Sequence, residues 1–150
     1  MSEVTVRQVR AEDAEYIMRL SEQLGYPSSL EQMQRRIDLI IDSQQDQVFV
    51  AVSEDRTVVG WIHVFVTMRL ESEPFAEIGG IIVDSDYRDR GIGKILMEHV
   101  EDWAENKNLT KLRVRSRTSR DNAHRFFKSY GFTQSKTQHI FDKPLGIGKR

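Results

Sequence analysis

The chain lacks cysteine altogether and holds only three prolines among its 150 residues. Without thiols, a disulfide scaffold, a thiolate metal site and a cysteine nucleophile are all excluded. No stretch approaches the roughly 20 apolar residues that cross a membrane, and residues 1–10 lack the apolar run of a signal peptide. We therefore expect a soluble, cytoplasmic protein that has no membrane partner.

A strong overall charge is also missing, since the formal net charge is −1. The two parts of the chain nevertheless differ. Residues 1–86 carry 7 Lys and Arg against 16 Asp and Glu, a net charge of −9, whereas residues 87–150 carry 15 against 7, a net charge of +8. This division predicts one region that attracts an anion and another that attracts a cation. Two solvated surfaces of opposite sign are the alternative.

Length and apolar content are sufficient for one core. A chain of this size buries roughly two-thirds of the surface that it exposes when unfolded, and 39% of its residues are hydrophobic. We expect a single domain over residues 3–145, followed by a flexible tail over residues 146–150.

Hydrophobic periodicity predicts a mixed α/β layout. The expected elements are a strand near 4–9, helices over 11–24 and 30–41, strands over 48–52, 58–66 and 76–83, a helix from 92 to about 106, a strand over 112–116, a short helix over 123–130, and one or two closing strands over 132–141. Ser28 and Glu31 predict a capping box for the second helix. Residues 70–74 are expected to interrupt the strands, and Gly79-Gly80 predicts a bulge or a close approach to the backbone.

Residues 81–94 carry the clearest chemical signal. An apolar strand leads into a short basic loop and then into Gly91-Ile92-Gly93-Lys94 at the start of a helix. The first N–H groups of a helix have no internal partner and lie at the positive end of its dipole, so this junction predicts an anion site. Arg88, Arg90 and Lys94 add positive charge there.

Two common phosphate loops do not fit this segment. A Walker A loop needs a different glycine spacing and a hydroxyl residue after Lys94. A dinucleotide fingerprint needs a third glycine where Leu96 stands. A second Gly-Ile-Gly-Lys string, at residues 146–149, has no strand before it and no helix after it.

The pattern that fits has Arg or Gln at its first position, any two residues next, and then Gly-x-Gly. It is satisfied by Arg88, Gly91 and Gly93 and resembles the pyrophosphate loop of the GNAT family of N-acetyltransferases. The C-terminal part resembles the same family at Asn122, Ala123, Phe126, Phe127, Tyr130, Gly131 and Phe132. The resemblance extends over about residues 3–145. It implies the acyl-CoA N-acyltransferase fold, an α/β fold whose mixed, mainly antiparallel central sheet carries helices on both faces.

The resemblance also implies acetyl-CoA as the co-substrate. By position, backbone groups of Ile81 and Val83 would pair with the pantetheine arm. The amides of residues 88–94 would hold the pyrophosphate, and Asn122 would contact the arm. These cofactor-binding residues are Ile81, Ile82, Val83, Arg88, Asp89, Arg90, Gly91, Ile92, Gly93, Lys94 and Asn122. Two positions depart from the family's usual pattern: Ser85 stands where many members have Pro, and Asp89 where many have Gly. We expect the Asp89 side chain to point to solvent.

Two residues are candidates for catalysis. Direct attack by the amine is the economical mechanism here, since a cysteine-linked acyl-enzyme is impossible. The resemblance places Tyr130 beside the sulfur, where its hydroxyl would protonate the leaving thiolate; the alternative is an aromatic ring that only packs on Phe126. Glu77 occupies a place similar to the catalytic Glu of the family's histone-acetylating branch. It is a candidate base, directly or through water, and a solvated residue at the end of a strand is the alternative.

Other features indicate no further chemistry. The four histidines lack ligand spacing, so no metal is expected. Arg113, Arg115 and Arg117 are expected to form a solvated strand face, since no aromatic residues interleave to bind nucleic acid. We predict an acetyl-CoA-dependent N-acetyltransferase that acts on a small cationic amine. Acetylation of a protein N-terminus or lysine, and a non-catalytic acyl-CoA-binding module, remain alternatives, and a homodimer is left open.

Overall fold

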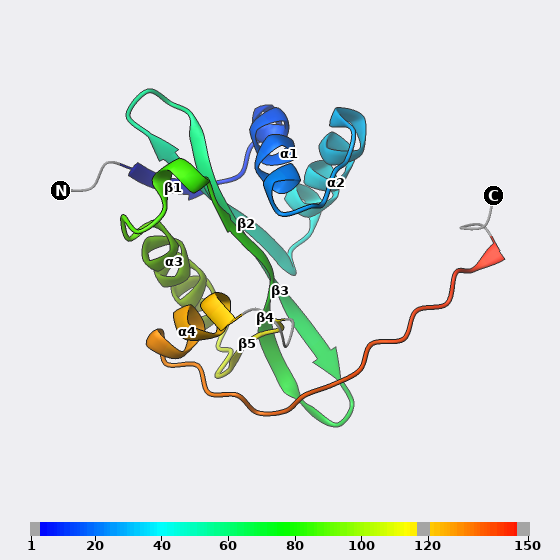
Figure 1. The fold of residues 1–150 in the computed structure, drawn as a ribbon. Helices are drawn as coiled ribbons and strands as arrows, with labels where there is room; N and C mark the ends of the chain where they lie inside the picture. Colours follow the sequence, from blue (N-terminus) through cyan, green and yellow to red (C-terminus); the bar gives the residue numbers. More distant parts are fainter. Residues whose placement is uncertain (1–3, 117–120, 147–150) are drawn as a thin grey trace. The chain divides into compact units, whose positions relative to one another are not determined.

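The computed structural model describes residues 4–116 and 121–146 of the chain (Figure 1). It divides into two compact units, Met1–Arg115 and Ser116–Arg150. The first unit contains, in chain order, β1 (Val4–Gln8), the 3-10 turn η1 (Ala11–Asp13), α1 (Ala14–Gln23), α2 (Leu30–Asp42), β2 (Asp46–Ser53), β3 (Val58–Arg69), β4 (Ser72–Val83), the 3-10 turn η2 (Ser85–Tyr87), α3 (Ile92–Asn106) and β5 (Leu112–Val114). The second unit contains α4 (Asp121–Ser129).

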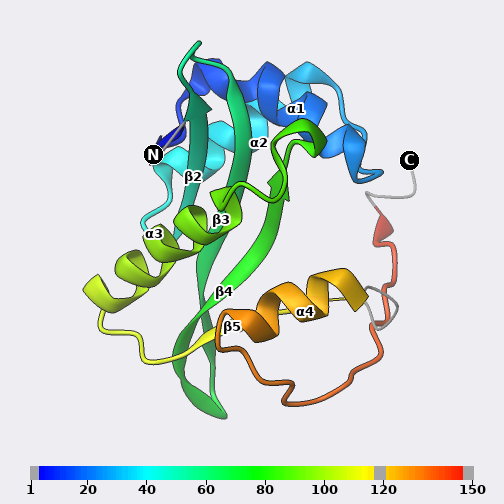
Figure 2. The same ribbon diagram turned by 60° about the vertical axis from the view of Figure 1, so that its left-hand side comes forward.

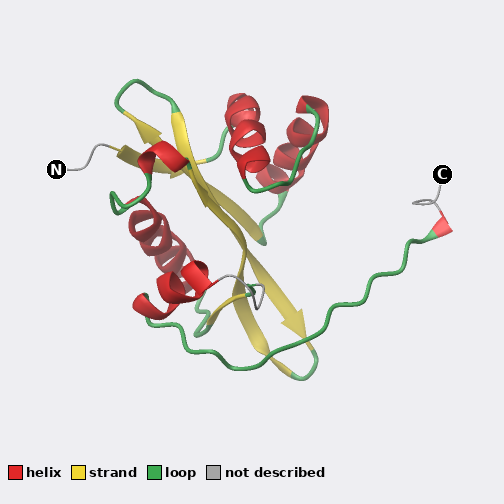
Figure 3. Cartoon of the chain, viewed as in Figure 1, coloured by secondary structure: helices red, strands yellow, loops and turns green. Residues whose placement is uncertain are grey.

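The strands of the first unit form one sheet in the order β1-β2-β3-β4-β5 (Figure 3). β1 to β4 pair antiparallel with their neighbours, and β5 pairs parallel with β4. A parallel pair needs a crossover connection, which α3 supplies between β4 and β5. The predicted mixed, mainly antiparallel sheet is confirmed.

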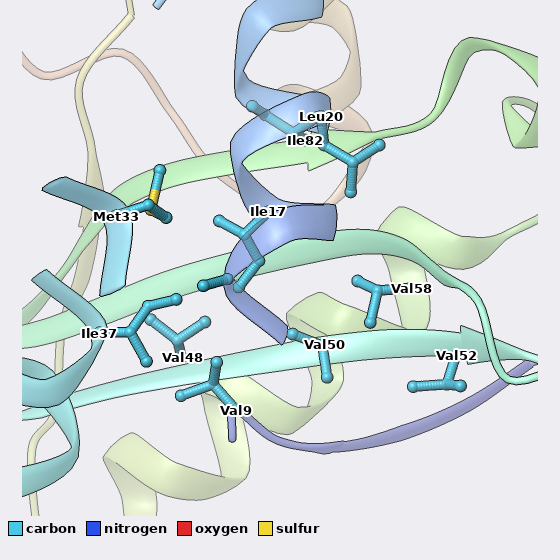
Figure 4. Packing of buried hydrophobic residues seen from close by; sticks show 11 residues of the cluster. Val9, Ile17, Leu20, Met33, Ile37, Val48, Val50, Val52, Val58 and Ile82 are labelled. Atoms are coloured by element: carbon cyan, nitrogen blue, oxygen red, sulfur yellow. The ribbon is translucent and has the colours of Figure 1, made fainter. Parts of the chain in front are cut away.

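One face of the sheet packs on α1 and α2 (Figure 4). Ile17 and Leu20 of α1 and Met33 and Ile37 of α2 recur at helical spacing and are buried against strand side chains, among them Val50. Burying such a side chain contributes about 1.5–3 kcal/mol. The predicted amphipathic helices therefore form this layer of the core.

The other face of the sheet packs on α3 (Figure 2). Leu96, Met97 and Val100 are fully buried. Gly60 of β3 lies beneath this helix, since a Cβ atom there would be 3.5 Å from both Ile92 Cγ2 and Leu96 Cδ1. Helices therefore cover both faces of the sheet, as predicted.

Two local predictions were wrong in register. The capping box of α2 is Ser29 with Gln32, not Ser28 with Glu31: Ser29 Oγ accepts from the Gln32 N–H at 3.1 Å, and Gln32 Oε1 accepts from the Ser29 N–H at 2.9 Å. The break predicted over residues 70–74 is confined to Leu70 and Glu71, because Arg69 already pairs with Ser72 across a tight hairpin.

The second unit ends its helix as predicted and lacks the predicted closing strands. Gly131 follows α4 with φ of +91°, the left-handed conformation that stops a helix. The Phe127 ring contacts those of Phe126 and Phe132, with centroids 5.6 and 5.8 Å apart. The structure shows no strand over residues 132–141. Residues 133–139 are all polar, so they offer no apolar face that a sheet could bury. The last four residues of the predicted tail lie outside the described part.

Candidate functional site

β4 contains a bulge at Gly79 that divides the strand into two parts. The register passes from His63 opposite Gly80 to Val64 opposite Ile78, which leaves Gly79 as the extra residue. Both predicted features, the bulge and the close approach, are present. A Cβ at Gly79 would lie 2.9 Å from His63 Nδ1, and one at Gly80 would lie 3.0 Å from the Trp61 ring.

The bulge coincides with the end of the pairing between β4 and β5. β5 pairs with β4 only from Ala76 to Ile78, whereas β3 follows β4 as far as Val83. Beyond Ile78, no strand in residues 4–116 or 121–146 pairs with the outer edge of β4. Backbone groups along this open edge are therefore available to a ligand.

The hydrogen-bond pattern identifies which residues face the open edge. The Asp84 N–H donates to the Val59 carbonyl of β3 at 2.8 Å. Alternate residues of an antiparallel strand bond to the same side, so Ile82 also faces β3, and Ile81 and Val83 direct their N–H and C=O groups to the open edge. In agreement, Arg88 Nε donates to the Val83 carbonyl at 3.4 Å. The Ile82 side chain is buried in the α1 and α2 layer.

The helix that follows begins at Gly91, which lies in the left-handed region with φ of +80°. A Cβ at Gly91 would meet nothing within 4 Å, so the backbone is openly approachable. The N–H groups of Ile92, Gly93 and Lys94 are in the first turn of α3 and lack partners within the helix. This helix start has the geometry of an anion site, and anion binding there stays a prediction.

The loop between β4 and α3 contains both departures from the family pattern. The Ser85 N–H donates to Gln23 Oε1 of α1 at 3.3 Å, a bond that proline could not make. Asp89 is exposed, as predicted, and has φ of +64°. Glycine adopts that conformation without strain, and Asp is among the side chains that tolerate it. Arg90, also exposed, stacks over the Tyr87 ring at 4.9 Å.

Glu77 is buried in β4 and is not a solvated residue at a strand end. Arg115 Nε donates to Glu77 Oε2 at 2.7 Å, and Thr67 Oγ1 donates to Oε1 at 3.1 Å. Arg113 stacks over the buried Phe75 ring at 4.6 Å. The expectation of a solvated arginine face was therefore wrong for Arg113, which is half-buried, whereas Arg115 is exposed and forms an ion pair with Glu77. Arg117 lies outside the described residues.

Sequence reasoning missed a histidine–carboxylate contact near the bulge. His63 Nε2 lies 2.8 Å from Asp46 Oδ1, and Ser43 Oγ donates to Asp46 Oδ2 at 2.8 Å. His63 and Asp46 are 17 positions apart, and only the register of β2 and β3 brings them together. No spacing motif indicates such a pair.

Tyr130 and Asn122 belong to the second unit. The Tyr130 ring contacts Phe126 with centroids 5.3 Å apart, and the Tyr130 N–H donates to the Phe127 carbonyl at 3.0 Å. Packing on Phe126 is thus confirmed, and the predicted acid role stays a prediction. Asn122 lies in the first turn of α4.

Among the described residues no three His, Asp or Glu side chains are grouped to hold a metal ion. No helix in that part of the chain is long and apolar enough to span a membrane. The open strand edge and the unobstructed basic helix start suit a ligand with an amide-bearing arm and phosphates. These features are those of an α/β protein with a candidate site for such a ligand.

Comparison with known proteins gives the family. Residues 13–132 match the sequence model of the acetyltransferase (GNAT) family, and the chain belongs to this family. It is an N-acetyltransferase that uses acetyl-CoA as its co-substrate.

Relatives are similar over nearly the whole chain. An uncharacterised N-acetyltransferase of Chlorobaculum tepidum is 27% identical, over 95% of this chain and 83% of its own length. The aminoglycoside N(6′)-acetyltransferase type 1 of Stenotrophomonas maltophilia is 25% identical, over 94% of each chain.

Solved structures share the fold. An aminoglycoside N-acetyltransferase in complex with CoA has a TM-score of 0.85 and 19% identity, covering 97% of both chains. An aminoglycoside 6′-N-acetyltransferase of Acinetobacter baumannii has a TM-score of 0.82 and 18% identity, covering 95% of this chain and 99% of its own. The predicted fold class is confirmed.

Proposed function

We propose that this enzyme transfers the acetyl group of acetyl-CoA to a primary amine of a small acceptor that carries at least one further positive charge. The observation that carries the proposal is the acidic surface of the first unit. Residues 11–42, which include α1 and α2, hold seven Asp and Glu against three Arg, and six of these seven acids are exposed. Such a surface steers cations toward the protein.

A named relative supports this substrate class. The Stenotrophomonas maltophilia enzyme is an aminoglycoside acetyltransferase, and aminoglycosides carry several amino groups that are protonated near neutral pH. The family supports an amine acceptor in general. An acceptor with one reacting amine and further ammonium groups agrees with both.

For the co-substrate, we propose that residues 88–94 hold the pyrophosphate with their amides and with the charges of Arg88, Arg90 and Lys94. Ile81 and Val83 pair with the pantetheine arm through the backbone groups at the open edge, and Asn122 contacts the arm. When bound, acetyl-CoA supplies an activated acyl group, since its thioester carbonyl accepts a nucleophile and its thiolate is a good leaving group.

The proposed reaction is direct attack by the neutral amine. The Tyr130 hydroxyl is suited to give a proton to the departing sulfur, because the reference pKa of tyrosine, near ~10, lies above the roughly 8.5 of a thiol. The amine must also lose a proton. Glu77 is one candidate to receive it, directly or through water, because an ionised carboxylate has about four lone-pair sites and the bonds from Arg115 and Thr67 use one on each oxygen.

The acceptor class is tested with matched amines of charge +2, +1 and 0. We expect kcat/KM to rise with positive charge at low ionic strength and the differences to shrink at high salt, where the field is screened within roughly 8–10 Å. A lysine-bearing peptide and a peptide with a free N-terminus serve as comparison acceptors. Equal kcat/KM values across the amines, or a preference for the neutral one, would refute the cationic-acceptor proposal.

A further inference from the structure

His63 is held on the face of the sheet that also carries Glu77. On β3, His63 lies opposite Gly80, and Phe65, two residues on, lies opposite Glu77. Strand residues two positions apart share a face, and residues paired across strands share it too. The bulge at Gly79 lies between these two pairs, so the His63 ring lies beside the point where the open edge begins.

The two nitrogens of the His63 ring have different surroundings. Nε2 lies 2.8 Å from Asp46 Oδ1, and Asp46 is held in turn by Ser43. An ionised carboxylate only accepts hydrogen bonds, so Nε2 carries the hydrogen, and in the neutral ring Nδ1 presents a lone pair. No residue in 4–116 or 121–146 donates to Nδ1, and the His63 side chain is 24% exposed, so the ring is partly open to solvent.

Gly79 determines where Nδ1 points. A Cβ at residue 79 would lie 2.9 Å from Nδ1, closer than real Cβ contacts allow, and 3.0 Å from Phe65 Cε1, closer than most of them. Only glycine leaves room for the ring at this position. The backbone of the bulge and the orientation of the histidine are therefore coupled.

Glu77 differs from His63 in its partners. Arg115 and Thr67 engage its two oxygens, at 2.7 and 3.1 Å. Taking a proton onto this buried carboxylate would weaken its ion pair with Arg115, whose own side chain is 39% exposed. Protonation of His63 Nδ1 breaks no ion pair, and Asp46 stabilises the imidazolium that forms.

Resting on the proposed transfer to an amine, we propose that His63 is the catalytic base and that Asp46 is its positioning residue. Nδ1 takes one proton from the acceptor's ammonium group, so that an N–H bond breaks, an Nδ1–H bond forms and the nitrogen keeps its electron pair. That pair forms the amide C–N bond as the C–S bond breaks. The second proton of the nitrogen replaces, through solvent, the one that Tyr130 gives to sulfur, and His63 releases its proton to solvent.

The first test needs no acceptor. ¹⁵N NMR of the imidazole nitrogens, recorded where the ring is neutral, should show hydrogen on Nε2 and none on Nδ1 of His63. Asp46→Ala should abolish this preference, while His139, which is exposed, provides an internal reference. A wild-type His63 with its hydrogen on Nδ1 would overturn the proposal.

The second test measures the kcat of His63→Gln with an alkylamine and with a fluorinated amine. His63→Gln keeps a donor toward Asp46 but cannot take a proton, so kcat for an alkylamine should fall about 10²- to 10⁴-fold. The loss should be at least tenfold smaller with a matched amine that is fluorinated beside its nitrogen and is already neutral in the assay. The Kd for CoA and the unfolding temperature should not change, and His139→Gln is the matched control.

Each result has one meaning. Equal losses with both amines would assign His63 a packing role and overturn the proposal, and so would the graded loss if it appeared with Glu77→Gln instead. A wild-type enzyme that acetylates peptides but neither amine would refute the proposed acceptor class. The two-acceptor kinetics would then be repeated with a lysine peptide and its fluorinated analogue. The ¹⁵N NMR test of the His63 tautomer needs no acceptor and stays the same.

Discussion

Replacement of Gly79 by alanine is a sharp test of the bulge. The added Cβ would lie 2.9 Å from His63 Nδ1 and 3.0 Å from Phe65 Cε1, where ordinary contacts begin near 3.4 Å. Both neighbours are rings, and His63 is also held by Asp46. Overpacking of this kind costs about 1–3 kcal/mol, and the lower chain entropy of alanine in the unfolded state returns about 0.4–1 kcal/mol.

We therefore expect Gly79→Ala to lower the free energy of unfolding by about 1–2 kcal/mol, which corresponds to roughly 2–8 °C in Tm for a chain of this size. Turnover should also fall, because the His63 ring has to move. Thermal and urea unfolding measure the first effect, and steady-state kinetics measure the second. Gly146→Ala is the matched control, since a Cβ there meets nothing within 4 Å. A Gly79→Ala protein with unchanged stability and turnover would refute this account of the bulge.

Two further predictions concern the co-substrate and the leaving group. Gly91→Trp should weaken CoA binding, because a bulky side chain would cover the helix start; Gly146→Trp, in the other Gly-Ile-Gly-Lys string, should not, and calorimetry that finds equal affinities would contradict the assigned loop. Tyr130→Phe should keep the fold and CoA affinity, since the ring still packs on Phe126, but should lose about 10²- to 10⁴-fold in kcat. Unchanged kcat with chemistry rate-limiting would leave Tyr130 a packing role only.

The fold could be predicted where local chemistry decides it. Apolar stripes define two amphipathic helices, with Ile17 in α1 and with Met33 and Ile37 in α2. Gly131 ends a different helix, α4. Errors arose where two local signals compete. Ser28 and Ser29 each begin an S-x-x-E/Q string, and in the structure α2 begins after Ser29.

The site was predictable in part for a similar reason. The basic loop and its Gly-x-Gly lie within one continuous segment, so their spacing is visible in the sequence. The Asp46–His63 and Glu77–Arg115 pairs join residues 17 and 38 positions apart. They depend on the register of strands, which a single sequence leaves open. Neither pair involves a residue type that is unusual by itself.

The bond from Arg88 to the Val83 carbonyl has a consequence for the protein without its co-substrate. A row of unpaired strand groups is a template on which another extended chain can add, and natural sheets protect such edges with charged side chains. Arg88 covers one acceptor of this row and places a cation beside it. Arg88→Ala should therefore leave the edge of β4 open to pairing with other chains, and the variant should self-associate more readily when CoA is absent than when it is present.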